Sequence, residues 1–250
     1  MSTHPLSQND FARKAIKGYR RLSMGIVVSA GILLILLFYF QLFGDLNPLH
    51  HSISHYYHED GKFLAMQSLE RFGYNGIRLG DLLVGTLSAI AVFLFWFSGF
   101  SKWEDRLLSA GGAMLLGVAW IPTQRAQELC EPAGISAHFV FAILFFVSIL
   151  LVATVFAHKR EAFSGVMAGT PSFQRWFAFS AALMVVVPLL IWLVSMAGGC
   201  SYFPSWVFWA EWTAILFFGV YWAGKMFEFN RALLASQASL QGLTSSWWAR

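Results

Sequence analysis

The sequence predicts an all-α integral membrane protein, a bundle of six transmembrane helices with both termini in the cytoplasm. Three observations lead to this prediction. Of the 250 residues 57% are hydrophobic and only 12% are charged, whereas soluble domains carry about 25% charged residues. Apolar runs long enough to cross a bilayer recur along the chain. Lys and Arg gather at alternate ends of these runs, as the orientation of membrane proteins requires.

The chain begins with a basic segment, 1–23, which we interpret as a cytoplasmic tail. The apolar run that follows has no small-residue cleavage site, so it is interpreted as a span and not as a secretory signal. A long outer loop, 44–78, follows the first span, and the chain closes with a polar cytoplasmic tail, 228–250. The six predicted spans are about 24–43, 79–100, 107–121, 135–157, 176–196 and 204–227.

The distribution of basic residues sets the predicted orientation. With the N-terminus inside, 13 of the 17 Lys and Arg residues fall in inner segments. The other 4 fall in outer segments, namely Lys62, Arg71, Arg78 and Arg125. This bias predicts a bacterial inner-membrane protein with both termini cytoplasmic. Because the basic residues sit at span ends and form no patch, the pI of about 9.2 does not indicate a nucleic-acid partner.

The chain has two cysteines, and the topology places both in outer loops. Cys130 follows the third span and Cys200 follows the fifth. The compartment outside a bacterial inner membrane is oxidising and permits disulfides. We therefore expect a Cys130–Cys200 bond between the two loops, with two free thiols as the alternative.

The polar residues that are candidates for a functional site lie in the outer loop before the second span and at the outer ends of three spans. The three ionisable residues near these span ends are Asp81, His138 and Glu211. Intramembrane charges are costly and mark functional sites by default. Glu211 is expected to pair with Arg78 or Arg125, to bind a cation or to stay protonated. The polar cluster of the outer loop comprises His50, His51, Ser52, Ser54, His55, Tyr56, Tyr57 and His58.

The histidine spacing permits a metal site. If 50–58 is helical, His51, His55 and His58 share one face, and Asp81 or His138 completes a ligand set for zinc. Haem, with His138 as an axial ligand, is a second option. Ser54 beside a histidine suggests a nucleophile, and Glu211 a general base. The alternative is a solvated histidine-rich loop, since no fixed metal-spacing motif is present.

The strings SISHYYH and GDLLVG resemble a family of uncharacterised bacterial six-span inner-membrane proteins. Members of that family carry an S-I-S-x-Y-Y element before the second span, a D-x-x-V-G span start, a Pro-Thr step after the third span and a histidine in the fourth. Here the two elements are separated by about 20 residues, 59–77, more than in the family. The resemblance implies a fold and a site location but no activity. The matching residues are Ser52, Ile53, Ser54, Tyr56, Tyr57, Asp81, Val84, Gly85, Pro122, Thr123 and His138.

A more distant resemblance is to the alkaline ceramidase-like membrane hydrolases, which use Ser, Asp and three His around zinc. This chain lacks their paired histidines in the last helix, where Glu211 is the nearest equivalent. It also has six predicted spans, not seven.

Three classes of function remain open from the sequence. The preferred one is a non-catalytic accessory component that binds lipid or a cofactor, alone or with other membrane subunits, because no catalytic motif is present. The alternative is a metal-dependent hydrolase acting on a membrane lipid. An ion-coupled transporter ranks third, since internal repeats and broken helices, which are common in transporters, are not evident.

Overall fold

The computed structural model of the chain describes residues 8–43, 53, 79–97, 101–121, 136–156, 173–198 and 205–247. Within these ranges the protein contains helices and no strand, which confirms the all-α prediction. A short π-helical segment, η2, continues α5 without a break. The elements are α1 (Gln8–Phe43), α3 (Leu79–Trp96), α4 (Lys102–Trp120), α5 (Ala137–Leu151), η2 (Val152–Phe156), α7 (Gln174–Gly198) and α8 (Trp206–Trp247).

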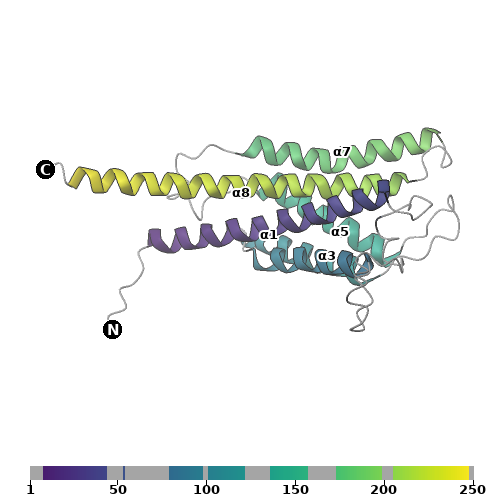
Figure 1. The fold of residues 1–250 in the computed structure, drawn as a ribbon, viewed down its shortest axis with the longest axis horizontal. Coiled ribbons are helices and arrows are strands. Elements are labelled where there is room, and N and C mark those ends of the chain that lie inside the picture. Colours follow the sequence, from purple (N-terminus) through teal and green to yellow (C-terminus); the bar gives the residue numbers. More distant parts are fainter. Residues whose placement is uncertain are drawn as a thin grey trace.

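The helices lie roughly parallel to one long axis (Figure 1), and their contacts follow chain order and close into a ring. α1 packs on α3, α3 on α4, and α4 on α5; η2 leads to α7, α7 packs on α8, and α8 closes the ring against α1. Consecutive helices run in opposite directions, so α1, α4 and α7 end where α3, α5 and α8 begin (Figure 1). We call this end of the bundle the α8-start end.

Three helical stretches are long and apolar enough to cross a membrane: Arg13–Tyr39, Ala137–Val155 and Gln174–Gly198. The apolar part of α3, Gly80–Trp96, is shorter. α4 begins with several charged residues, and α8 contains charged residues within its length. Both helices are therefore less hydrophobic than the three stretches above. Large apolar side chains point outward from the bundle, among them Ile35, Phe179 and Met196. Such an apolar exterior is typical of a surface that faces lipid or another protein.

α1 and α8 are longer than the spans predicted for them. Both continue past the other helices toward the two termini (Figure 1). The extensions pack together: Ile16 and Phe229 are fully buried, and Arg20 Nη1 donates to Asn230 Oδ1 at 3.1 Å. Part of each segment predicted as a tail is therefore helix continuous with the neighbouring span, because it has a partner helix to bury its apolar face against.

Serine caps set the beginnings of α4 and α5. Ser101 Oγ accepts from Glu104 N, and Ser136 Oγ accepts from Phe139 N, both at 3.2 Å. Ser101-Lys102-Trp103-Glu104 is an S-x-x-E capping sequence, which satisfies backbone groups left open at a helix start. The cap starts α4 at Lys102, ahead of the predicted span start at about 107.

Candidate functional site

A cavity of about 90 Å³ lies inside the ring, between α3, α4, α5 and α8. Three of these helices line it with residues at intervals of four and three, the spacing that keeps side chains on one helix face. Apart from two polar side chains, the lining residues described by the structure are apolar. These three helices contribute Leu83, Leu87 and Ile90 from α3, His138, Ala142 and Phe145 from α5, and Glu211, Ile215 and Phe218 from α8.

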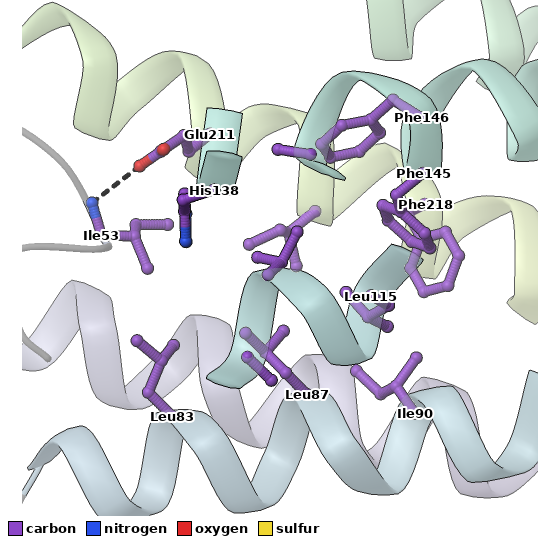
Figure 2. A pocket seen from close by; sticks show the side chains of 14 residues that line it. Ile53, Leu83, Leu87, Ile90, Leu115, His138, Phe145, Phe146, Glu211 and Phe218 are labelled. Atoms are coloured by element: carbon purple, nitrogen blue, oxygen red, sulfur yellow. Dashed lines mark hydrogen bonds between the residues drawn. The ribbon is translucent and has the colours of Figure 1, made fainter. Parts of the chain in front are cut away.

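The two polar lining residues, Glu211 and His138, lie together at one end of the cavity. Figure 2 shows them beside Ile53, with Phe145 and Phe218 at the other end. His138 lies in the first turn of α5 and Glu211 in the second turn of α8, so this end of the cavity faces the α8-start end of the bundle. We call Glu211, His138 and Ile53 the cavity mouth. The arrangement of an apolar interior with a few polar groups at one side is that of a small-molecule or lipid site.

Glu211 connects α8 to Ile53, which lies within the histidine-rich sequence 50–58. Its Oε2 accepts a hydrogen bond from Ile53 N at 2.7 Å, and the buried Ile53 side chain lines the cavity. Next to it, Trp212 Nε1 donates to Leu34 O at 3.2 Å and ties α8 to α1. The Trp212 bond fixes the rotation of α8, so that the neighbouring Glu211 faces inward.

His138 is held by the end of the preceding helix. Its Nδ1 lies 2.8 Å from Ile121 O. A carbonyl oxygen only accepts hydrogen bonds, so Nδ1 carries the proton in this contact. The bond joins the end of α4 to the start of α5 and orients the buried imidazole at the cavity mouth.

The structure brings together some of the residues that the sequence singled out. Glu211 and His138 line one cavity, and Ile53 of the S-I-S-x-Y-Y element joins them. Asp81 lies in the first turn of α3, as expected, but its side chain is exposed and is not among the described lining residues. The partners considered for Glu211, Arg78 and Arg125, lie outside the described residues.

The metal and disulfide predictions rest mainly on residues that the structure does not describe. His51, Ser54, His55 and His58 belong to that group, and so do Cys130 and Cys200. Among the described residues, no three His, Cys, Asp or Glu side chains come together as metal ligands. A zinc or haem site and the disulfide therefore stay predictions.

Sequence reasoning missed a buried polar cluster that lies farther along α8 than the residues lining the cavity. Glu104, Tyr221, Lys225 and Glu228 are all at most 1% exposed. Lys225 Nζ lies 3.9 Å from Glu228 Oε2 and 4.6 Å from the centre of the Phe177 ring. The Tyr221 hydroxyl lies within electrostatic range of both carboxylates. The available signals were the capping sequence before Glu104 and the spacing of three between Lys225 and Glu228.

Comparisons with known proteins identify no relative. No protein-family model matches the chain, and neither a curated protein nor a solved structure matches it. The family resemblances of the S-I-S-x-Y-Y and D-x-x-V-G elements therefore stay sequence-based predictions.

Proposed function

We propose that this chain is a non-catalytic membrane component that binds the apolar chain of a lipid or a lipid-like cofactor. The observation that supports the proposal is the cavity itself, with its apolar lining and its polar mouth. Because the bilayer is as apolar as the cavity lining, the hydrocarbon chain would be held there by van der Waals packing and not by removal from water. Glu211 and His138 then fix the orientation of the ligand, because they offer polar contacts at one end only.

The proposed protein spans the bacterial inner membrane six times with both termini in the cytoplasm. In the described residues, six α-helices of alternating direction support this topology, as does the bias of Lys and Arg toward inner segments. In it the cavity mouth faces the outer leaflet, and the paired extensions of α1 and α8 project into the cytoplasm. The shorter or more polar helices α3, α4 and α8 are stabilised by packing against α1, α5 and α7.

Reporter fusions test the topology. A fluorescent protein at the C-terminus is expected to fluoresce, and alkaline phosphatase at the same place is expected to be inactive, because that enzyme needs an oxidising compartment. Phosphatase inserted in the loop 44–78 is expected to be active. Active phosphatase at the C-terminus would contradict the proposed orientation.

A cavity-filling variant tests ligand binding. Ala142→Phe places a ring in the cavity and is expected to lower the amount of lipid retained by the full-length protein at least about tenfold, the effect of about 1.4 kcal/mol. Native mass spectrometry of the protein released from mild detergent measures the retained lipid.

The matched control is Ala182→Phe, which adds the same ring to an exposed position on α7. It is expected to retain lipid as the unmodified protein does. Equal retention by all three proteins would show that the lipid binds elsewhere and would overturn the proposal.

The second candidate is a metal-dependent hydrolase that acts on a membrane lipid. It is favoured by the position of Glu211 and His138 beside Ile53, which is flanked in sequence by Ser52 and Ser54. In this mechanism His51, His55, Asp81 and His138 hold zinc, and Glu211 is the general base. Elemental analysis separates the candidates: stoichiometric zinc that is lost in an Asp81→Ala/His138→Ala variant supports the hydrolase, and metal-free protein supports the binding component.

A further inference from the structure

The exposed face of α1 changes from basic to apolar along one continuous helix. Its exposed side chains recur every three or four residues and therefore form a single stripe on the helix surface. The first part of the stripe is basic, the second part is apolar, and no break in the helix separates them. We call Lys14, Lys17 and Arg21 the basic stripe, and Met24, Val28, Ile32 and Ile35 the apolar stripe.

Both stripes point away from the bundle. The opposite face of α1 packs against α3 and α8 and contains the fully buried residues Ile16, Ile26 and Leu37. Each side chain of the apolar stripe is at least 48% exposed. In the proposed topology the apolar stripe therefore contacts the acyl chains of the surrounding lipid.

The change from basic to apolar sets the depth of α1 in the bilayer. A hydrocarbon core about 30 Å thick takes about 20 helical residues, which is the length of α1 from Met24 to its end at Phe43. At 1.5 Å per residue, Arg21 then lies about 5 Å and Lys17 about 10 Å outside the hydrocarbon. The headgroup region on each side is about 5–7 Å thick, and long basic side chains extend along a helix toward polar surroundings. Both cations therefore reach the depth of the lipid phosphates.

The acids of α1 itself lie far from these two cations. The sequence contains no Asp or Glu between Asp10 and Asp45. Asp10 precedes Lys17 by seven residues, which is about 10 Å along the helix. Arg20 adds a further positive charge beside Arg21, and its bond at 3.1 Å is to the neutral amide of Asn230.

The rest of the chain supplies few acids at this depth. On the two helices that pack against α1, Glu228 is 1% exposed, and Asp81 and Glu211 lie near the opposite, α8-start end. The segment 157–172 contains one acid, Glu161, which directly follows two basic residues in the sequence. Over the whole sequence the inner segments contain 13 Lys and Arg but only five Asp and Glu, so this side of the protein is positively charged.

We propose that the basic stripe binds the anionic headgroup of a phospholipid in the cytoplasmic leaflet, with an acyl chain of that lipid along the apolar stripe. This site lies on the outside of the bundle, separate from the cavity, and it rests on the proposed membrane topology. The guanidinium group of Arg21 donates two hydrogen bonds to phosphate oxygens, and Lys17 adds a second positive charge. Each cation near an anionic membrane surface strengthens binding about fivefold. A zwitterionic lipid gains less, because its headgroup also carries a positive charge.

Two photoreactive phospholipids with identical acyl chains, a phosphatidylglycerol and a phosphatidylcholine, test the inference. Each carries a diazirine halfway along one acyl chain, so that it labels side chains at that depth of the bilayer. The full-length protein is labelled in phosphatidylcholine nanodiscs that contain one of the two probes, and mass spectrometry identifies the labelled peptides. Labelling of the apolar stripe is divided by labelling of the exposed α7 residues Phe179 and Val185, which report the concentration of each probe around the bundle.

The normalised labelling by phosphatidylglycerol is expected to exceed that by phosphatidylcholine at least about fivefold. In Lys17→Gln/Arg21→Gln the ratio of the two is expected to approach one, whereas Lys17→Arg/Arg21→Lys keeps both charges and is expected to keep the preference. The matched control is Lys102→Gln/Arg106→Gln, which removes two exposed cations four residues apart at the start of α4. This control is expected to leave the ratio at the apolar stripe unchanged.

The outcomes separate this site from the proposed function. Equal normalised labelling by the two lipids, or a preference that survives in Lys17→Gln/Arg21→Gln, overturns the lipid site and leaves an acidic soluble protein as the occupant of the basic stripe. Neither result affects the cavity, which is tested by lipid retention in Ala142→Phe. If neither lipid labels the apolar stripe while α7 is labelled, α1 does not face the bilayer, and the proposed topology fails together with the site.

Discussion

Replacing Lys225 with methionine is expected to destabilise the folded protein by about 3 kcal/mol, as for the removal of one partner of a buried ion pair. The ammonium group is buried between the Glu228 carboxylate and the face of the Phe177 ring. Glu104 is also fully buried, and its carboxylate interacts electrostatically with Tyr221, which lies one helical turn before Lys225 on α8. Methionine keeps the volume of the side chain but removes the positive charge from a cluster with two acidic groups. Loss of the folded state on heating in mild detergent measures the effect.

Two further variants show whether charge is the cause. Lys102→Met changes an exposed lysine at the start of α4 and is expected to leave stability within about 0.5 kcal/mol of the original. The double variant Lys225→Met/Glu228→Gln is expected to recover part of the loss, because it no longer buries the Glu228 charge. If Lys225→Met unfolds at the same temperature as Lys102→Met, the ion-pair explanation is wrong.

Replacing Gly224 with alanine is expected to disrupt the contact between α7 and α8 and to cost about 2 kcal/mol, as in overpacked cores. A Cβ at this position would clash with the indole ring of Trp176 and lie 3.1 Å from Phe177 Cε1. Trp176 is half-exposed and can swing outward, but it would then lose the bond from its Nε1 to Val220 O at 2.9 Å. The indole therefore cannot yield without a loss of stability. Resistance of the purified protein to unfolding by SDS measures the change.

Gly219 on the same helix is the matched control. A Cβ there would meet only Ala30 Cβ at 3.7 Å, which is an ordinary contact. Because alanine favours helix more than glycine does, Gly219→Ala is expected to be neutral or slightly stabilising. Equal resistance of the Gly224→Ala and Gly219→Ala variants would contradict the close packing of α7 on α8.

Much of the architecture follows from the sequence because apolar runs and helix starts are local signals. The helical class is confirmed, and Asp81 and His138 lie in first turns, as expected. The lengths of α1 and α8 could not be predicted in this way. Their extensions are polar at many positions, and their stability depends on each other through Ile16, Phe229 and the Arg20–Asn230 bond.

The candidate site could be predicted only in part. Glu211 and His138 stood out because ionisable groups are rare in apolar runs. The cavity could not be predicted from the sequence, because a spacing of four and three between apolar residues occurs on any packed helix. From the sequence, Lys225 is only one of the 13 basic residues of the inner segments, and the tertiary structure shows it buried against Phe177. Two residues that contact each other but lie far apart in the sequence leave no local sequence pattern that predicts their contact.

The most direct test of the proposed function is a density map of the full-length protein in lipid nanodiscs. We expect elongated density that starts at Glu211 and His138 and continues between Leu87, Ala142 and Phe218. A map that shows the cavity closed by its own side chains, or filled only by ordered water, would contradict the proposal that the protein binds an apolar chain.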